Sequence, residues 1–252
     1  SSGSEPAQSG ELAPINFQTS FFFNGWDAPF FLALDNGYYK EAGLDVTIRE
    51  GKGSADAMKT LLGGANDIVE AERTAMAIQA TEIEGLRSIA SLVDPNGMII
   101  LSYKDRNITK PEDLIGKTVA ISLGSSEAGI IPEFLKLNGV DESAVQIENV
   151  DSSQKAQFLK SGKVDAISWQ NFSAVGIDSL DKFNMVAVAD YGMNLLGNGL
   201  VSTEGWLAEH GDLARAFIEA TKRGWDAMIE NPQSGVDALL KRTTSLSAEA
   251  AL

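Results

Sequence analysis

The stretch FFFNGWDAPFFLALDNGYYKEAGLDVTIRE, residues 21–50, decides the fold. It follows an apolar segment, residues 15–19, that is typical of a strand. Pro29 then opens an apolar helix, in a first turn where the N–H that proline lacks would be unpaired anyway. After Gly43, apolar and polar residues alternate over residues 44–49, which is the period of a strand. The stretch therefore predicts a strand–loop–helix–strand unit.

Predicted strands and helices continue to alternate along the rest of the chain. We predict further strands near residues 67–69, 86–93, 98–103, 118–122, 145–150, 164–168 and 185–189, with helices between most of them. Such a pattern indicates parallel βαβ units. A weak repeat matches LLGGANDIVEA (61–71) with LKSGKVDAISW (159–169), so that Gly64 aligns with Gly162 and Asp67 with Asp165. Because the match falls at the same helix-to-strand junction of each half, it favours two similar domains.

The predicted architecture is α/β, with two domains joined by two crossings that permit hinge closure on a ligand. The crossings are expected near residues 98–104 and 195–201. The expected parts are a flexible linker (1–13), a discontinuous first lobe (14–101 plus 199–252) and a second lobe (102–198).

The end of the first lobe is predicted to be helical. A helix that starts near Asp212 is expected to cover this lobe. The final residues, SLSAEAAL, are typical of a helix that is beginning with Ser247 as its cap, so we expect truncation or disorder beyond Leu252.

The composition excludes several classes of function. The 252 residues are 44% hydrophobic and carry a formal net charge of −15, which argues against a nucleic-acid binder. The absence of Cys excludes disulfides, thiolate metal sites and a Cys nucleophile. A single histidine, His210, argues against a His-based metal site and a Ser-His-Asp triad. We therefore expect no metal, no cofactor and no catalysis. No apolar run approaches the roughly 18 residues of a membrane span, and any export signal would have been removed.

Two segments carry a resemblance to a known family. APFFLALDNGYYKEAGLDVTI (28–48) resembles the opening of the extracytoplasmic substrate-binding proteins of ABC importers, and GKTVAISLGSSEAG (116–129) resembles the start of their second domain. The branch is the one that includes nitrate, taurine, aliphatic sulfonate and thiamine-pyrimidine-precursor binders, and the related thiamine-pyrimidine synthases. The resemblance implies a periplasmic-binding-protein type II architecture and a monomer that delivers a small molecule to a membrane permease. It also implies a location in the periplasm or, as a lipoprotein, at the outer face of the cell membrane.

Candidate ligand-binding residues follow from the rule that open α/β sheets bind ligands beyond the carboxyl ends of their strands. They are Asn24, Trp26, Asp27, Glu70, Glu72, Ser125, Ser126, Trp169, Gln170, Asn171, Tyr191 and Asn198. Two of them have plainer interpretations: Ser126 as a helix N-cap, and Trp169 as a packing residue. Trp26 stands among loop residues, which favours contact with a ligand.

The charges at these strand ends predict the kind of ligand. Asp27, Glu70 and Glu72 outnumber the one nearby cation, Arg73, which is expected to point away. Carboxylates accept hydrogen bonds from amino and ring N–H groups, so we expect a neutral or cationic heterocycle, first a pyrimidine related to thiamine and second a flavin-like ring. The alternatives are an alkanesulfonate, taurine or nitrate binder, a synthase-like enzyme with Glu70 and Glu72 as an acid/base pair, and a chemoreceptor module. The synthases that the chain resembles carry a Cys-rich motif that is absent here.

Overall fold

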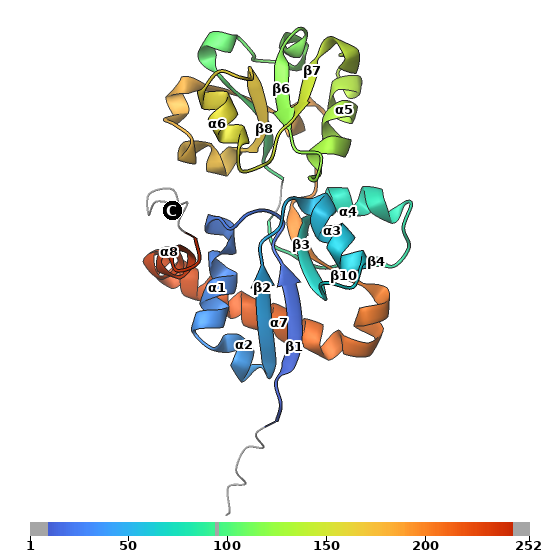
Figure 1. Ribbon diagram of the computed structural model, residues 1–252, viewed down its shortest axis with the longest axis vertical. Helices are drawn as coiled ribbons and strands as arrows, with labels where there is room; N and C mark the ends of the chain where they lie inside the picture. Colours follow the sequence, from blue (N-terminus) through green and yellow to red (C-terminus); the bar gives the residue numbers. More distant parts are fainter. Residues whose placement is uncertain (1–9, 94–95, 244–252) are drawn as a thin grey trace, which may run out of the picture.

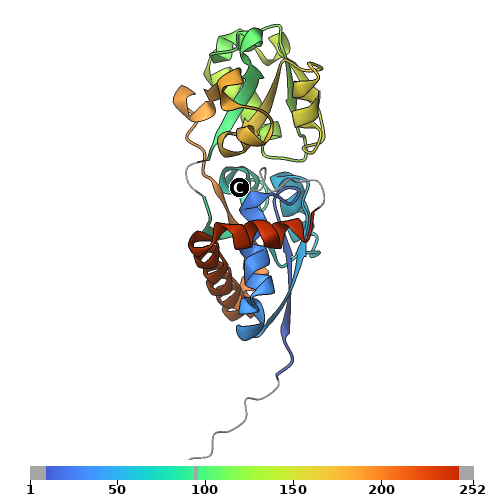
Figure 2. The same ribbon diagram turned by 90° about the vertical axis from the view of Figure 1, so that its left-hand side faces the viewer.

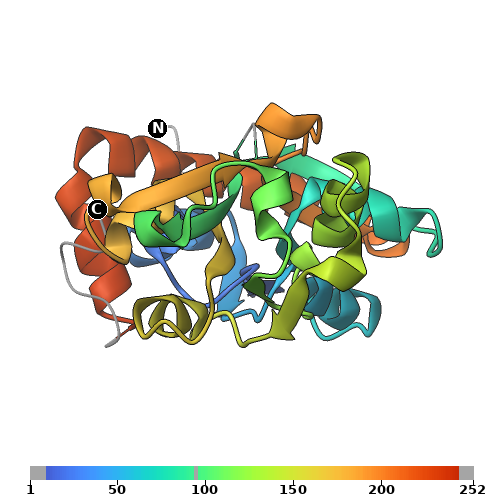
Figure 3. The ribbon, with the colours of Figure 1, turned by 90° about the horizontal axis from the view of Figure 1, so that it is seen from above.

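The computed structural model describes residues 10–93 and 96–243, and it consists of two α/β lobes stacked along the long axis (Figure 1). Figure 2 shows the same stacking from the side, and Figure 3 shows the second lobe lying over the first. Most of the predicted linker 1–13 and the helix start at Ser247 lie outside the described residues, and Ala13 already belongs to the first strand. In the part that the structure describes, no helix is both long and apolar enough to cross a membrane.

The first lobe is built on a mixed sheet. Its strands are β1 (Ala13–Gln18), β2 (Leu44–Arg49), β3 (Ile68–Glu72), β4 (Leu86–Ser91) and β10 (Asn198–Thr203). They lie in the order β2–β1–β3–β10–β4. β1 is parallel to β2 and β3, whereas β10 is antiparallel to β3 and β4. The carboxyl ends of β1 and β3 therefore meet at one edge of the sheet, which faces the second lobe (Figure 1).

The second lobe repeats this sheet with other segments of the chain. Its strands are β5 (Met98–Tyr103), β6 (Thr118–Ile121), β7 (Gln146–Asn149), β8 (Ala166–Gln170) and β9 (Phe183–Ala187). They lie in the order β7–β6–β8–β5–β9, with β6 parallel to β7 and β8, and β5 antiparallel to β8 and β9. The two sheets thus share one topology, as the internal repeat predicts.

Helices cover both faces of each sheet. In the first lobe α1 (Ala28–Asp35), α2 (Tyr38–Glu41), α7 (Glu204–Glu230) and α8 (Pro232–Leu240) lie on one side, and α3 (Ser54–Leu62) and α4 (Arg73–Ala80) on the other. Adjacent residues of a buried strand face opposite sides. Ile68 accordingly packs with Phe17, Phe30 and Phe217, and Val69 with the residues of α3.

The second lobe follows the same plan. α5 (Glu127–Leu137) packs on one face of the sheet, against Ile100 and Ile121, and α6 (Lys155–Lys160) lies on the other, near Ile99 and Ile167. Both sheets are therefore sandwiched between helices, and only their strand ends are free to form a site between the lobes.

The predicted repeat has a physical basis. Asp67 hydrogen bonds to Asn16 of β1 twice: its carboxylate accepts from Asn16 N at 2.7 Å and its own N donates to Asn16 O at 2.8 Å. Asp165 does the same to the start of β6, through Thr118 N at 2.9 Å and Thr118 O at 2.9 Å. Each Asp thus fixes the register of its strand against the neighbouring one.

Several predicted boundaries are wrong. β3 runs on to Glu72 and β8 to Gln170, because backbone pairing with β10 and β5 continues past the apolar residues on which the prediction depends. α7 begins at Glu204, with the Thr203 hydroxyl accepting from Trp206 N at 3.3 Å, and a kink at His210 accounts for the later predicted start.

The crossings also differ from their predicted places. Residues 98–101, which the sequence assigns to the first lobe, pair with β8 and β9 of the second. The chain leaves the first sheet after Ser91 and enters the second at Met98, so the first crossing precedes the predicted 98–104. It returns between Tyr191 and Asn198, and the predicted second crossing, 195–201, overlaps β10.

Candidate functional site

The corner after β1 is built around Asp27. Asn24 and Asp27 form a capping box at the short helix η1 (Gly25–Asp27): Asn24 Oδ1 accepts from Trp26 N at 3.0 Å, and Asp27 Oδ2 accepts from Asn24 N at 2.8 Å. The Asn24 amide also donates to Phe22 O at 3.0 Å. The polar groups of Asn24 therefore serve the loop itself, and the Asp27 side chain is only 1% exposed.

Glu70 completes a buried carboxyl pair with Asp27. Its Oε1 accepts from Asn198 Nδ2 at 2.8 Å and its Oε2 from Ser20 N at 3.3 Å, and its side chain is hydrogen bonded to that of Asp27. Burial, and for Asp27 the neighbouring Glu70 charge, raise the pKa of both carboxyls. Because two buried carboxylates in contact repel each other, uptake of a proton by the pair is favoured. The protonated pair then offers both a donor and acceptors.

Glu72, the last residue of β3, reaches the other lobe. The Ser126 hydroxyl donates to its Oε2, and Gln170 Nε2 donates to its Oε1 at 3.3 Å. Its side chain also bonds to Asn96, in the first crossing. Burial first, and the Glu127 charge second, raise the pKa of Glu72 to about 7. β3 thus carries Glu70, whose carboxyl bonds within the first lobe, and Glu72, whose carboxyl bonds to the second lobe.

The second lobe contributes a turn between β6 and α5. Ser125 Oγ donates to Ser122 O at 2.8 Å and accepts from Glu127 N at 3.2 Å, which caps the helix. Ser126 occupies the predicted N-cap position of α5, but its hydroxyl makes no capping hydrogen bond and is directed at Glu72 instead. The side-chain hydrogen bond to the helix N-terminus therefore comes from Ser125, and the Ser126 hydroxyl contacts the first lobe.

A buried ion pair that the sequence does not indicate lies below this turn. Lys155 Nζ is 2.6 Å from Glu127 Oε1 and donates to Ser168 O at 2.9 Å, and Lys155 is 1% exposed. Glu127 Oε2 in turn accepts from Ser122 N at 2.9 Å, so the pair holds the turn in place. The one sequence signal is indirect: Lys155 lies among polar residues at the start of a helix, where a lysine is ordinarily exposed.

The two candidate tryptophans lie one in each lobe and pack partly against their own lobe. Trp26 is half-buried with its ring 6.0 Å from that of Trp225. Trp169 is also half-buried, with Lys155 Nζ 5.6 Å from its ring centre, and its buried Nε1–H has no acceptor within the described part of the chain. Such a donor costs about 1–3 kcal/mol when it stays unpaired, so a ligand acceptor would be favoured there.

Three candidate residues remain: Asn198, Asn171 and Tyr191. Asn198 is the partner of Glu70. Asn171 is exposed and its N donates to Gly97 O at 2.9 Å in the first crossing. Tyr191, in η7 (Val188–Tyr191), packs on Phe134 and its hydroxyl donates to Thr109 O at 3.4 Å, apart from the groups that meet at the cleft.

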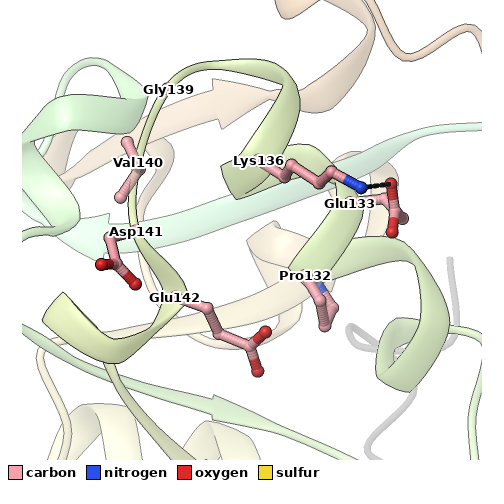
Figure 4. Close-up of a pocket in the computed structure, with 7 residues that line it drawn as sticks. All are labelled: Pro132, Glu133, Lys136, Gly139, Val140, Asp141 and Glu142. Carbon is pink, nitrogen blue, oxygen red and sulfur yellow. Dashed lines mark ion pairs between the residues drawn. The ribbon is translucent and has the colours of Figure 1, made fainter.

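Two surface hollows lie elsewhere. The larger, about 450 Å³, is on the outer side of the second lobe and is lined by Pro132, Glu133, Lys136, Gly139, Val140, Asp141 and Glu142 (Figure 4). Another, of about 260 Å³, lies beside Trp225 and β4. Neither is lined by a predicted site residue, and the chemistry of the convergent strand ends favours the cleft as the site. Among the described residues no group of three His, Cys, Asp or Glu side chains is placed to hold a metal ion.

Comparison with known proteins adds a family. The family model described as NMT1/THI5 like matches residues 25–235. The formylaminopyrimidine-binding protein of Halalkalibacterium halodurans is 24% identical over 91% of this chain and 70% of its own. A 4-amino-5-hydroxymethyl-2-methylpyrimidine phosphate synthase of Aspergillus parasiticus is 23% identical over 88% of this chain and 69% of its own. Among solved structures, the periplasmic aliphatic sulphonate binding protein SsuA of Escherichia coli superposes with a TM-score of 0.74 at 16% identity, covering 96% of this chain and 81% of SsuA.

Proposed function

Because the chain belongs to the NMT1/THI5-like family, we propose that it is the solute-binding component of an ABC import system, which captures an aromatic heterocycle between its lobes. It then delivers this solute to a membrane permease. We place it outside the cytoplasm, as a monomer that is free or held by a lipid anchor. The periplasmic protein SsuA has the same fold, which supports this location.

The observation that carries the ligand class is the buried carboxyl pair of Asp27 and Glu70. A pair that holds one proton offers a donor beside acceptors, and an aminopyrimidine edge offers an acceptor ring nitrogen beside an amino donor. The formylaminopyrimidine-binding relative supports a pyrimidine as the first choice, with a flavin-like ring second. Trp26 and Trp169 offer flat surfaces from the two lobes.

A sulfonate or nitrate suits this cleft less well. Lys155, the buried cation nearest to Trp169, is already bonded to Glu127 and Ser168. Arg73 directs its Nε to Gly197 O at 3.3 Å, and its aliphatic stem lies over Gly199. An anion bound at these strand ends would lie near Asp27 and Glu70, and those carboxyls would repel it when ionised.

Binding without turnover is the favoured activity, although one relative is named as a synthase. The chain has no Cys. His210 lies at the kink of α7 with its ring 5.2 Å from that of Trp206, away from the cleft. Glu70 bonds to Asn198 and Glu72 to the second lobe, so the two do not form an acid/base pair around a common space.

A calorimetric panel of aminopyrimidines, riboflavin, taurine, alkanesulfonates and nitrate tests the proposal. We expect a heterocycle to bind, and Glu70→Gln to weaken it by about 10-fold or more, since hydrogen bonds to charged groups contribute about 1.5–3 kcal/mol. Glu133→Gln, on the exposed face of α5, is the matched control. Tight binding of a sulfonate with no response to any heterocycle would overturn the assignment of ligand class.

The tryptophans give an independent check. Loss of either ring should weaken binding by more than the roughly 0.5–1.5 kcal/mol of an aromatic contact, because buried area is lost too. Trp26→Ala and Trp169→Ala should therefore each weaken the heterocycle in the same calorimetric assay. If both folded variants bind as the unaltered protein does, the ligand lies elsewhere.

A further inference from the structure

Glu72 is the place where the two lobes are joined through a titratable side chain. Its carboxyl belongs to β3 of the first lobe and bonds to Ser126 and Gln170 of the second. Its backbone N donates to Ser54 Oγ at 3.0 Å, which anchors this strand end within the first lobe. The residue is 2% exposed. Two of its hydrogen-bond donors and part of its burial are therefore supplied by the other lobe.

The backbones of the lobes also meet beside this contact. Asp56 N donates to Gly124 O at 3.1 Å, and a Cβ at Gly53 would lie 2.4 Å from the same oxygen. Gly53 also has a φ of 136°, which side chains other than glycine rarely adopt. All these contacts are between protein groups of the two lobes, and they bury Glu72 where the lobes meet.

The charges around Glu72 do not neutralise it. Glu127 on α5 and Lys155 on α6 face it from the second lobe, but they are paired with each other at 2.6 Å. On its own side, Glu70 lies two residues away on β3 and bonds to Asp27 on η1. The next residue, Arg73, donates to Gly197 O. An ionised Glu72 is thus desolvated on closure and gains no cation of its own from the second lobe.

We propose that closure of the two lobes is coupled to the uptake of a proton by Glu72. When the lobes are together, the neutral carboxyl keeps its hydrogen bonds to Ser126 and Gln170 and has no charge to desolvate. When they part, water reaches the carboxyl and the proton leaves. This proposal depends on the proposed function in one respect: closure of the lobes is the step that captures the solute.

The sign of the pH effect follows from the direction of the shift. Glu72 has a pKa of about 7 in the closed form, against 4.5 for an ordinary Glu. The closed form therefore binds a proton more tightly than the open form, and closure is favoured as the pH falls through 7. Between these two values the ratio of closed to open molecules should change by up to about tenfold per pH unit, and above 7 it should level off.

The experiment uses the ligand-free protein with a spectroscopic ruler. Because the chain has no Cys, Lys59→Cys on α3 and Glu133→Cys on α5 introduce one exposed labelling site in each lobe. Single-molecule energy transfer between the dyes should show a closed population that grows between pH 7 and pH 5. Glu72→Gln, a neutral side chain of the same shape, should close to the same extent at all pH values. Ser126→Ala should lower the closed fraction and keep the pH dependence.

A pH-independent population in the unaltered chain would overturn the proposal, and so would an unchanged pH response in Glu72→Gln. Urea unfolding of each variant at pH 6 confirms that the comparison is made on folded protein. Because no ligand is present, this result is independent of the solute panel. If the proposed ligand class is wrong, the coupling between closure and Glu72 is unaffected. If the coupling is absent, the proposed ligand class is unaffected.

Discussion

The two lobes share one strand plan but differ in the residues at their facing ends. Asp67 and Asp165 occupy matching positions 98 residues apart, and the same offset matches Glu70 with Ser168 and Glu72 with Gln170. The hydrogen bond between Glu72 and Gln170 also spans 98 residues, so the contact across the cleft joins equivalent positions of the two halves. The repeated frame is common to both lobes, and the chemistry is added at its strand ends.

The difference lies in how each lobe treats a buried acid. In the second lobe Glu127 has a cation, Lys155, at 2.6 Å. In the first, Asp27 and Glu70 have only each other and neutral donors, and burial raises the pKa of both. A neighbouring cation favours the charged form of a buried acid, whereas burial without a cation favours the protonated form. The facing end of the second lobe thus holds a buried ion pair, and that of the first holds acids whose pKa is raised by burial.

The largest effect on stability is expected when the buried ion pair of the second lobe loses its cation, Lys155. Lys155→Met should leave Glu127 buried and unpaired, and it should lower the free energy of unfolding by about 3–5 kcal/mol. Urea unfolding measures this loss. Adding Glu127→Gln should restore much of it, because the uncompensated charge is removed. Losses that simply add in the double variant would show that the two residues are not coupled.

The first lobe should respond to pH instead. The folded-state pKa of Glu72 is above its ordinary value, so its contribution to stability is complete at low pH and is lost as the pH rises through about 7. Asp27 and Glu70 shift in the same direction. The free energy of unfolding should therefore fall between pH 5 and pH 8, by up to about 3 kcal/mol for Glu72 alone. Glu72→Gln should flatten that part of the profile, and an identical slope in this variant would contradict the assignment.

The repeated frame predicts matched losses in the two lobes. Asp67→Ala and Asp165→Ala each remove a carboxylate that accepts from a backbone N–H of the neighbouring strand, Asn16 N or Thr118 N. Each should cost about 1.5–3 kcal/mol in urea unfolding, as for hydrogen bonds to charged groups. Asp165 also pairs with Arg106 at 2.9 Å, so its loss should be slightly larger. If only one of the two variants lost stability, the sequence repeat would not reflect a shared structural role of Asp67 and Asp165.

The frame was predictable because it depends on local patterns. Apolar alternation marks the strands, and Gly64 and Gly162, with φ of 75° and 70°, mark the turns before the matched Asp residues. The crevice rule then selects the strand ends, and the residues that it selects from the sequence alone include Asp27, Glu70, Glu72, Ser126 and Gln170. The internal repeat and the crevice rule are therefore enough to predict the strands and the residues at their ends.

The partners of those residues were not predictable. Lys155 is polar and lies at the start of a helix, and nothing in its neighbours indicates that the chain folds Glu127 onto it from 28 residues away. The choice of Ser125 over Ser126 as the cap depends on which hydroxyl the other lobe attracts. Strand ends were misjudged for a similar reason, since the pairing that extends β3 and β8 involves segments distant in the chain. Contacts between distant segments decide these details, and periodicity carries no information on them.

The smallest expected effect isolates the contact between the equivalent positions. Gln170→Ala removes one amide donor at 3.3 Å from Glu72 and should lower the free energy of unfolding by about 0.5–1.5 kcal/mol. The measure that matters is the coupling energy from a double-mutant cycle with Glu72→Ala, which subtracts whatever each side chain does alone. At pH 8 the carboxylate accepts the bond as an ion, and hydrogen bonds to ions are roughly twice as strong as neutral ones. The coupling should therefore be larger at pH 8 than at pH 5, although closure as a whole is weaker there. A coupling that is zero at both pH values would place Gln170 beside Glu72 without binding it, and would leave Ser126 as the partner that joins the lobes at Glu72.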